Sequence, residues 1–191
     1  MSWLAQLYDW SVSLHRGALQ AALRMAEAAP DERLLDVATG TGALLRELAR
    51  DISQQVHAVG IDRSRAMLSI ASQPPYVWPL VEADARVLPF PDASFDVVTV
   101  CYLLHLIDAG DRARVLQEVR RVVRPHGRVV VVTVDARRPT FRSFLAALPS
   151  GTGLRRVDLG SELDAAGLRL VRSCYPKAVW PSICLRAEAT Q

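Results

Sequence analysis

The sequence is poor in cysteine and histidine, and the few that it has are not grouped. Its three cysteines form no C-x-x-C pair, and its four histidines show no metal-ligand spacing. An odd number of unpaired cysteines argues against a disulfide scaffold, and we expect no metal site. Such cysteine usage favours a reducing compartment, so we expect a cytoplasmic protein.

Long apolar runs are also lacking. The first residues, MSWLAQLYDW, have no basic segment followed by an apolar core, so we expect no signal peptide. No apolar run approaches the roughly 20 residues that a helix needs to cross a bilayer. We therefore expect no stable membrane insertion.

Charge of either sign is unremarkable, because the formal net charge is only +3. The basic residues are almost all arginines, scattered along the chain, and Lys177 is the only lysine. Scattered charges are typical of solvated helix faces, so we expect no nucleic-acid partner. The sequence leaves the oligomeric state open.

What the chain does have is apolar content sufficient for one domain. Half of its 191 residues are apolar, and strand-like and helix-like segments alternate from residue 33 onward. This alternation predicts βαβ units and an α/β, Rossmann-like three-layer sandwich with a mostly parallel sheet. The expected strands are 33–37, 56–61, 76–82, 95–101 and 128–134, and the expected helices are 42–52, 64–71 and 111–124.

We expect a single domain over 1–191, with a cofactor-binding core at 31–135. Residues 1–30 carry apolar side chains at helical spacing, which predicts a helical segment. This segment is either packed on the core, a lid over a site, or a helix on a membrane surface. In the segment 136–191, the pattern predicts further helices at 140–148 and 161–166. It also predicts two terminal strands, at 168–175 and 183–187.

A glycine-containing turn follows the first expected strand. Residues 39–42 read Thr-Gly-Thr-Gly, where glycine permits a sharp turn and close approach of a ligand. The helix that follows offers N–H groups to an anion such as a carboxylate. In an open α/β sheet this is the crevice where ligands bind.

Acids at the ends of the strands narrow the ligand class. Asp62 ends the second strand, where its carboxylate suits a ribose diol of either a nicotinamide dinucleotide or S-adenosylmethionine. The dinucleotide pattern needs a third glycine, but Leu45 occupies that place. Asp36 suits the ammonium of a methionine moiety, and Asp84 suits an adenine amino group. We expect these three acids to surround one cavity.

Four stretches carry a family resemblance: LLDVATGTG, VGIDRSRAML, EADARVLPFPDASFDVV and LQEVRRVVRPHGRVVVV. In this order they resemble the class I S-adenosylmethionine-dependent methyltransferases, in particular the small-molecule branch similar to quinone-biosynthesis C-methyltransferases. The resemblance implies a seven-stranded sheet whose last strand is antiparallel. It also implies that the cofactor is S-adenosylmethionine, with S-adenosylhomocysteine as product.

The resemblance further implies which residues touch the cofactor. These are, for the methionine moiety, Asp36, Ala38, Thr39, Gly40 and Gly42; for the adenosine, Asp62, Arg63, Met67, Asp84 and Ala85; and beside the sulfonium, Cys101 and Tyr102.

Residues outside this set are candidates for the acceptor side. His105 lies four residues beyond the fourth strand and is a candidate general base, with a wall of the pocket as the alternative role. Tyr8 and His15 are candidates to close over the site, with packing as the alternative. The segment CYLLHLI lacks the Phe-Gly-Leu-Arg-Asn signature of the quinone enzymes, which counts against quinone acceptors in particular, and the sequence does not identify the acceptor.

The function expected is in-line methyl transfer to a small-molecule acceptor. One alternative is a nicotinamide-dependent oxidoreductase, which Leu45 and the absence of a Tyr-x-x-x-Lys dyad disfavour. The other is a protein that binds S-adenosylmethionine without catalysis, since a fold and a cofactor site do not guarantee chemistry.

Overall fold

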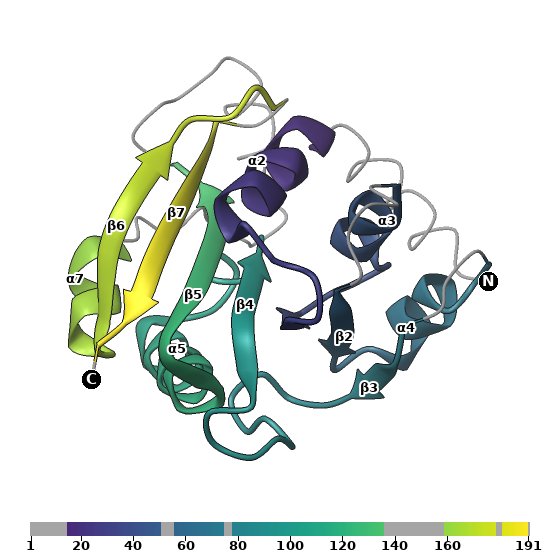
Figure 1. Ribbon diagram of the computed structural model, residues 1–191, viewed down its shortest axis with the longest axis horizontal. Helices are drawn as coiled ribbons and strands as arrows, with labels where there is room; N and C mark the ends of the chain where they lie inside the picture. Colours follow the sequence, from purple (N-terminus) through teal and green to yellow (C-terminus); the bar gives the residue numbers. More distant parts are fainter. Residues whose placement is uncertain (1–14, 51–55, 75–77, 136–158, 179–180, 191) are drawn as a thin grey trace.

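The computed structural model describes residues 15–50, 56–74, 78–135, 159–178 and 181–190. These residues form one seven-stranded sheet with helices on both faces (Figure 1). The strands are β1 Arg33–Val37, β2 His57–Asp62, β3 Leu80–Glu82, β4 Phe95–Cys101, β5 Val123–Val134, β6 Leu168–Cys174 and β7 Ser182–Ala189. The helices are α2 Arg16–Ala26, α3 Ala43–Arg50, α4 Arg65–Ala71, α5 Ala109–Val122 and α7 Leu159–Ala165.

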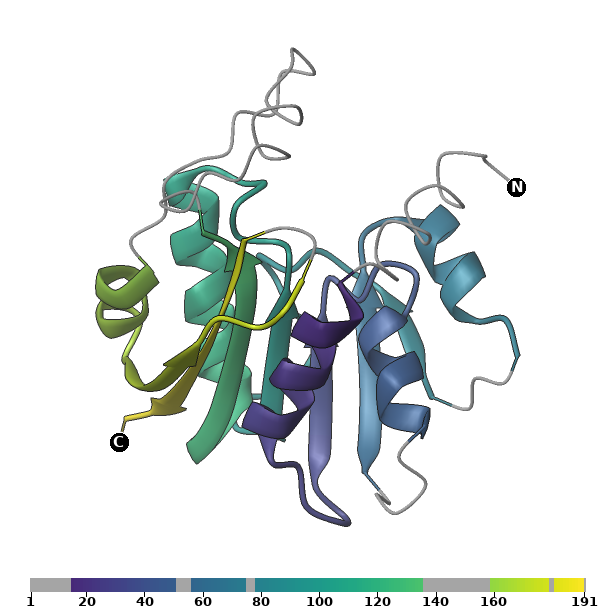
Figure 2. The same ribbon diagram turned by 90° about the horizontal axis from the view of Figure 1, so that it is seen from above.

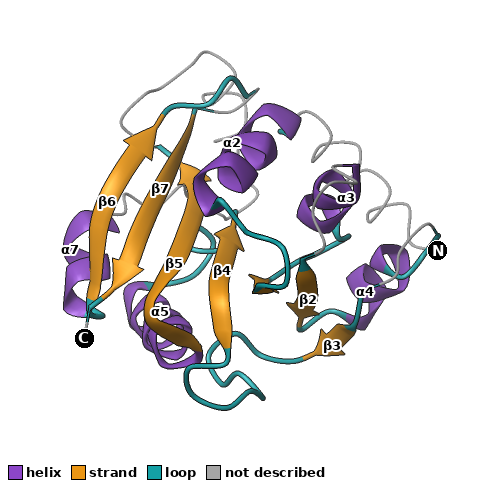
Figure 3. Cartoon of the chain, in the orientation of Figure 1, coloured by secondary structure: helices purple, strands orange, loops and turns teal. Residues whose placement is uncertain are grey.

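The strand order is β3-β2-β1-β4-β5-β7-β6. The strands β3, β2, β1, β4 and β5 pair in parallel, and β7 is antiparallel to both of its neighbours, β5 and β6 (Figure 3). This confirms the predicted fold class, including the antiparallel last strand. The chain runs outward from β1 to β3 and then returns to β4, so a crevice forms between β1 and β4 at the carboxyl edge.

Two apolar cores lie on opposite faces of the sheet. Leu34 of β1 packs in the core beneath α2 and α3, whereas its neighbour Leu35 packs in the core beneath α5 and α7. This alternation is the two-residue period of a strand buried on both faces. Figure 2 shows α2 and α3 side by side on one face, with α5 and α7 on the other.

The end of α5 differs from the prediction. The helix expected over 111–124 ends at Val122, and Val123 is already extended and pairs with Phe95 of β4. Arg124 precedes Pro125, and the proline ring disfavours the helical conformation of the residue before it. The early helix end follows from these two constraints.

Several predictions fall on residues that the structure does not describe. They concern Tyr8 and the rest of the segment 1–14, and the helix expected over 140–148. The described third strand begins at Leu80, and residues 75–77 lie outside the description. No helix in the described part of the chain is both long and apolar enough to cross a bilayer.

Candidate active site

A cavity of about 310 Å³ opens at the carboxyl ends of β1, β2, β3 and β4. Its volume lies in the range of small-molecule sites. The lining includes most of the predicted cofactor residues, namely Ala38, Gly40, Asp62, Arg63, Met67, Asp84, Ala85, Cys101 and Tyr102. The structure therefore brings together residues that are up to 64 positions apart between Ala38 and Tyr102.

The loop between β1 and α3 is fixed by the end of β2. The Gly40 N–H donates to Asp62 Oδ2 at 2.9 Å, and the Ser64 N–H donates to Asp62 Oδ1 at 2.8 Å. Gly40 has a φ of 55°, in the left-handed region that glycine adopts readily. Asp62 thus holds the glycine turn against β2 before any ligand arrives, and a ribose would share this carboxylate with the backbone.

Gly42 has a packing role in the structure. It does not line the cavity, and a Cβ added to it would lie 3.1 Å from the Cβ of Ala71 on α4. Its φ of 80° also requires the left-handed region. The predicted contact of Gly42 with the cofactor therefore lacks support from its position.

Leu45 fills the place where a dinucleotide site has its third glycine. A Cβ added to Gly60 of β2 would lie 2.9 Å from Leu45 Cδ1, so the close approach of helix and strand is made by the glycine on the strand. With a leucine side chain wedged between α3 and β2, the helix start differs from that of a dinucleotide site.

Asp36 is almost fully buried, with 2% of its surface exposed. Thr99, its partner in the β1–β4 register, donates its hydroxyl to Asp36 Oδ1 at 2.7 Å. Burial raises the pKa of Asp36 to about 6, although the nearby hydroxyls of Thr39 and Thr99 act in the opposite direction. The approach of the Thr39 hydroxyl falls short of hydrogen-bond geometry, so Thr39 Oγ1 is buried without a partner among the described residues.

The expectation that three acids surround one cavity is wrong for Asp36. Asp36 lines a smaller neighbouring cavity of about 30 Å³, together with Thr39, Thr41 and the start of α3. The two cavities share four wall residues: Ala38, Gly40, Cys101 and Tyr102. The reason is geometric, because Asp36 lies one residue before the end of β1 and faces α2, whereas Asp62 and Asp84 lie at or beyond strand ends.

Asp84 is held by Arg86 at the other end of the larger cavity. Arg86 Nη2 lies 2.6 Å from Asp84 Oδ2, and its Nε lies 3.0 Å from Oδ1. The same guanidinium reaches Asp111 in the first turn of α5, with Nη1 at 3.2 Å from both carboxylate oxygens. Hydrogen bonds from the Arg86 side chain and backbone lower the pKa of Asp84 to about 2.

The candidates for the acceptor side lie beside the two cavities. His105 Nδ1 is 3.2 Å from Thr133 Oγ1, and the rings of Tyr102 and His105 are 6.2 Å apart. Burial, with a smaller effect of the charge on His15, lowers the pKa of His105 to about 4. His15 is buried with its ring 4.9 Å from that of Tyr102. Neither histidine lines the two cavities described.

Sequence reasoning missed several residues that line the larger cavity. They are an arginine, an acid and apolar side chains, namely Arg86, Asp111, Leu103, Leu106, Ile107 and Val115. The signal for Arg86 was present, because a basic residue two positions after Asp84 can fold back onto it. Asp111 gave no such signal, since an acid in the first turn of a helix is ordinarily explained by the helix dipole.

Comparison with known proteins identifies the family of the chain. Residues 34–127 match the family model of the methyltransferase domain. The 2-phytyl-1,4-naphtoquinone methyltransferase of Trichormus variabilis is 34% identical over 148 residues, covering 73% of this chain and 62% of the relative. The ubiquinone/menaquinone biosynthesis C-methyltransferase UbiE of Geotalea uraniireducens is 30% identical, covering 79% of this chain and 71% of the relative. The chain belongs to the class I S-adenosylmethionine-dependent methyltransferase family.

Two solved structures show the same fold at low sequence identity. A SAM-dependent methyltransferase from Aquifex aeolicus superposes with a TM-score of 0.74 at 18% identity, covering 93% of this chain and 92% of the other. The [4+2]-cyclase SpnF has the same TM-score of 0.74 at 20% identity, covering 92% and 81%. The fold therefore does not by itself fix the reaction. The chain spans about three fifths of the length of the Trichormus relative, at 62%.

Proposed function

We propose that this protein transfers the methyl group of S-adenosylmethionine to a small-molecule acceptor by in-line displacement. The observation that carries the proposal is the pair of adjoining cavities with different acids. A buried carboxylate faces the small cavity at Asp36, and three further carboxylates, Asp62, Asp84 and Asp111, line the larger one. An amino acid joined through sulfur to an adenosine has this same division into a cationic end and a nucleoside end.

The residues present fit such a cofactor. Thr39 Oγ1 is a buried polar atom without a partner in the described part of the chain, and a cofactor carboxylate or ammonium would satisfy it. Asp36 is ionised at neutral pH because its pKa is about 6, so it favours an ammonium group. Asp62 retains acceptor capacity for ribose hydroxyls, because each carboxylate oxygen has two lone pairs.

The reaction needs alignment more than it needs acid–base chemistry. When bound, S-adenosylmethionine would supply a methyl group on a sulfonium, from which the neutral thioether is an intrinsically good leaving group. Cys101 and Tyr102 stand on the wall shared by the two cavities, where the sulfur would lie, and restrict the approach to that centre. His105, with a pKa of about 4, is neutral at physiological pH and a weak base, which disfavours it as the general base.

The acceptor class rests on the relatives. Both relatives carry the names of quinones, whereas the quinone-enzyme signature is absent from residues 101–107 of this chain, so we propose the broader class of small planar rings as the first acceptors to test. Leu103, Leu106 and Ile107 are among the residues that line the larger cavity, and their apolar side chains suit such a ring. A cytoplasmic location completes this proposal and agrees with the three free thiols of the chain.

Two measurements on the purified protein test the proposal. Calorimetry is expected to show binding of both S-adenosylmethionine and S-adenosylhomocysteine, with NAD giving no comparable heat. Incubation of the protein with S-adenosylmethionine and reduced 1,4-naphthoquinone is then expected to release S-adenosylhomocysteine, which mass spectrometry detects. Binding without product over a panel of phenol, amine and quinol acceptors would favour the non-catalytic alternative, and no binding on folded protein would remove the proposal.

A further inference from the structure

The cysteines of the chain, scattered in sequence, lie on one row across the sheet. In the strand registers, Cys101 of β4 pairs with Val132 of β5, Val132 pairs with Cys184 of β7, and Cys184 pairs with Cys174 of β6. Directly opposed residues in a sheet project from the same face. Cys101, Cys174 and Cys184 all belong to the core covered by α2.

Within this row, Cys174 and Cys184 are direct cross-strand neighbours, whereas Val132 separates Cys184 from Cys101. Opposed residues of an antiparallel pair have Cα atoms about 4.5 or 5.5 Å apart. Both spacings fall within the window of roughly 4.4 to 6.8 Å that a disulfide requires. The distance across two strands exceeds this window, so the geometry selects Cys174 and Cys184 as the bridging pair.

The two thiols of this pair have different surroundings. Cys184 is fully buried, and its Sγ donates to Met25 Sδ of α2 at 3.3 Å. Burial raises the pKa of the Cys184 thiol to about 12, with smaller contributions from the neighbouring Cys174. Cys174 is only partly buried and lies on β6, which is an edge strand of the sheet. Arg172 lies two positions away on the same face. An oxidant from solvent therefore meets Cys174 first.

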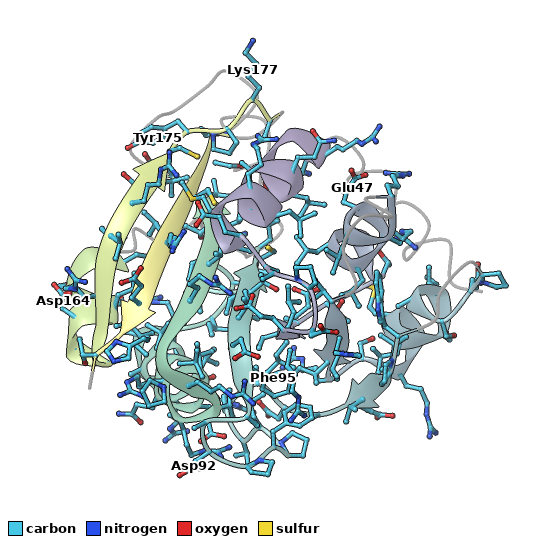
Figure 4. The ribbon with its side chains drawn as sticks, viewed as in Figure 1. Glu47, Asp92, Phe95, Asp164, Tyr175 and Lys177 are labelled. Carbon is cyan, nitrogen blue, oxygen red and sulfur yellow. The ribbon has the colours of Figure 1, made fainter. Side chains whose placement is uncertain are left out.

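We propose that Cys174 and Cys184 form a reversible disulfide when the protein meets a hydroperoxide. The inference is independent of the proposed methyl transfer, because it rests on the β6–β7 pairing and not on the cofactor cavities. Tyr175 and Lys177, labelled in Figure 4, mark the connection that leaves Cys174 at the outer end of β6. The disulfide would join β6 to β7 at the end of the two strands where this connection begins.

The chemistry balances in two steps. The Cys174 thiolate attacks the O–O bond of the hydroperoxide, which gives a sulfenic acid on Cys174 and releases the alcohol or water after protonation. The Cys184 sulfur then attacks the sulfenic sulfur, the S–O bond breaks, and the Cys184 proton leaves with the hydroxyl as water. The pair loses two electrons and the hydroperoxide gains them, and a thiol reductant reverses the bridge.

Peptide mapping tests the proposal directly. Cleavage after lysine and arginine places Cys174 in the peptide 173–177, Cys184 in 178–186 and Cys101 in 87–112. After treatment of the full chain with hydrogen peroxide, we expect peptides 173–177 and 178–186 to be joined, at a mass about 2 Da below their sum. Dithiothreitol is expected to separate them, and Cys101 is expected to remain a free thiol.

Variants provide matched controls. Cys101→Ser is expected to keep the linked peptide, whereas Cys174→Ser, at the partly buried edge position, is expected to lose it. The wild-type map is decisive even if a variant fails to fold. Sulfinic acid on Cys174 without a link, oxidation of Cys101 in its place, or a link between two chains would each overturn the proposal.

Discussion

At the two ends of the site, the surroundings shift the carboxylate pKa in opposite directions. At one end Asp36 is buried against the hydroxyl of Thr99, and its pKa is raised to about 6 chiefly because burial penalises the charge. At the other end Asp84 is bound by the guanidinium of Arg86, which lowers its pKa to about 2. Both acids nevertheless occupy similar positions, near the carboxyl ends of parallel strands.

The two pKa shifts differ because Asp84 is already paired with the cation of Arg86, whereas Asp36 is bound by a neutral hydroxyl. No cation is paired with Asp36 in the described part of the chain, and the charge stays costly until a cationic ligand arrives. Asp84 is already neutralised by Arg86, so it gains less from a ligand and acts as a preorganised acceptor. We infer that the small cavity supplies charge-dependent affinity and that the larger cavity supplies shape and hydrogen bonding.

The largest expected effect comes from the acid without a cation. Asp36→Asn is expected to weaken S-adenosylhomocysteine binding by roughly 100-fold, because a buried ammonium then lacks its counter-charge. Asp84→Asn is expected to weaken it by only about tenfold, since Arg86 remains nearby. Calorimetry on both variants measures this. Asp164→Asn on the exposed face of α7, labelled in Figure 4, is the matched control and should leave affinity unchanged.

The pH dependence of binding sharpens the same comparison. Ligand affinity is expected to fall about tenfold for each pH unit below the pKa of Asp36, which is about 6, because protonation removes the charge. Asp84 contributes nothing in this range because its pKa is about 2. A titration between pH 5 and 8 measures the effect. An inflection that persists unchanged in Asp36→Asn would assign it to another group.

The cost of burying the charge of Asp36 without a cationic partner is expected to appear as lost stability. Because the folded-state pKa of Asp36 is raised from 3.8 to about 6, its contribution favours folding at low pH and is lost as pH rises through 6. Asp36→Asn is therefore expected to stabilise the ligand-free protein by about 1–2 kcal/mol at pH 8. Denaturant unfolding at pH 5 and pH 8 measures this, and an equal or lower stability of the variant at pH 8 would contradict it.

The smallest expected effect concerns Arg86, the arginine that binds Asp84. Arg86→Met keeps much of the side-chain volume but removes the hydrogen bonds to Asp84 and Asp111. Both partners are partly exposed, so the loss in cofactor affinity is expected to be only about threefold. Direct titration with S-adenosylhomocysteine measures it. A loss as large as that of Asp36→Asn would mean that the two ends do not differ as described.

Much of the fold could be read from local pattern, and the exceptions have physical causes. The turn after β1 was predictable because only a few residue types permit its backbone, and Gly40 is at the expected place. The end of α5 was not, because the pairing of Val123 with Phe95 depends on a strand 28 positions earlier. The α/β alternation required no such long-range knowledge.

The site was predictable in its positions more than in its partners. Asp36, Asp62 and Asp84 lie near the ends of parallel strands, as predicted, because the carboxyl ends of such strands share an edge of the sheet. Their separation into two cavities, and the binding of Asp84 by Arg86, depend on side-chain directions that no local pattern encodes. Gly42 shows the same limit, since its neighbour Ala71 lies on a different helix.

One pair of ligands tests the central claim most directly. S-adenosylhomocysteine carries the amino-acid end, and 5′-methylthioadenosine keeps the adenosine but lacks that end. If Asp36 meets the ammonium, Asp36→Asn is expected to weaken S-adenosylhomocysteine by roughly 100-fold and to leave 5′-methylthioadenosine within about twofold. Equal losses for the two ligands in calorimetry would contradict the assignment of the small cavity to the methionine end.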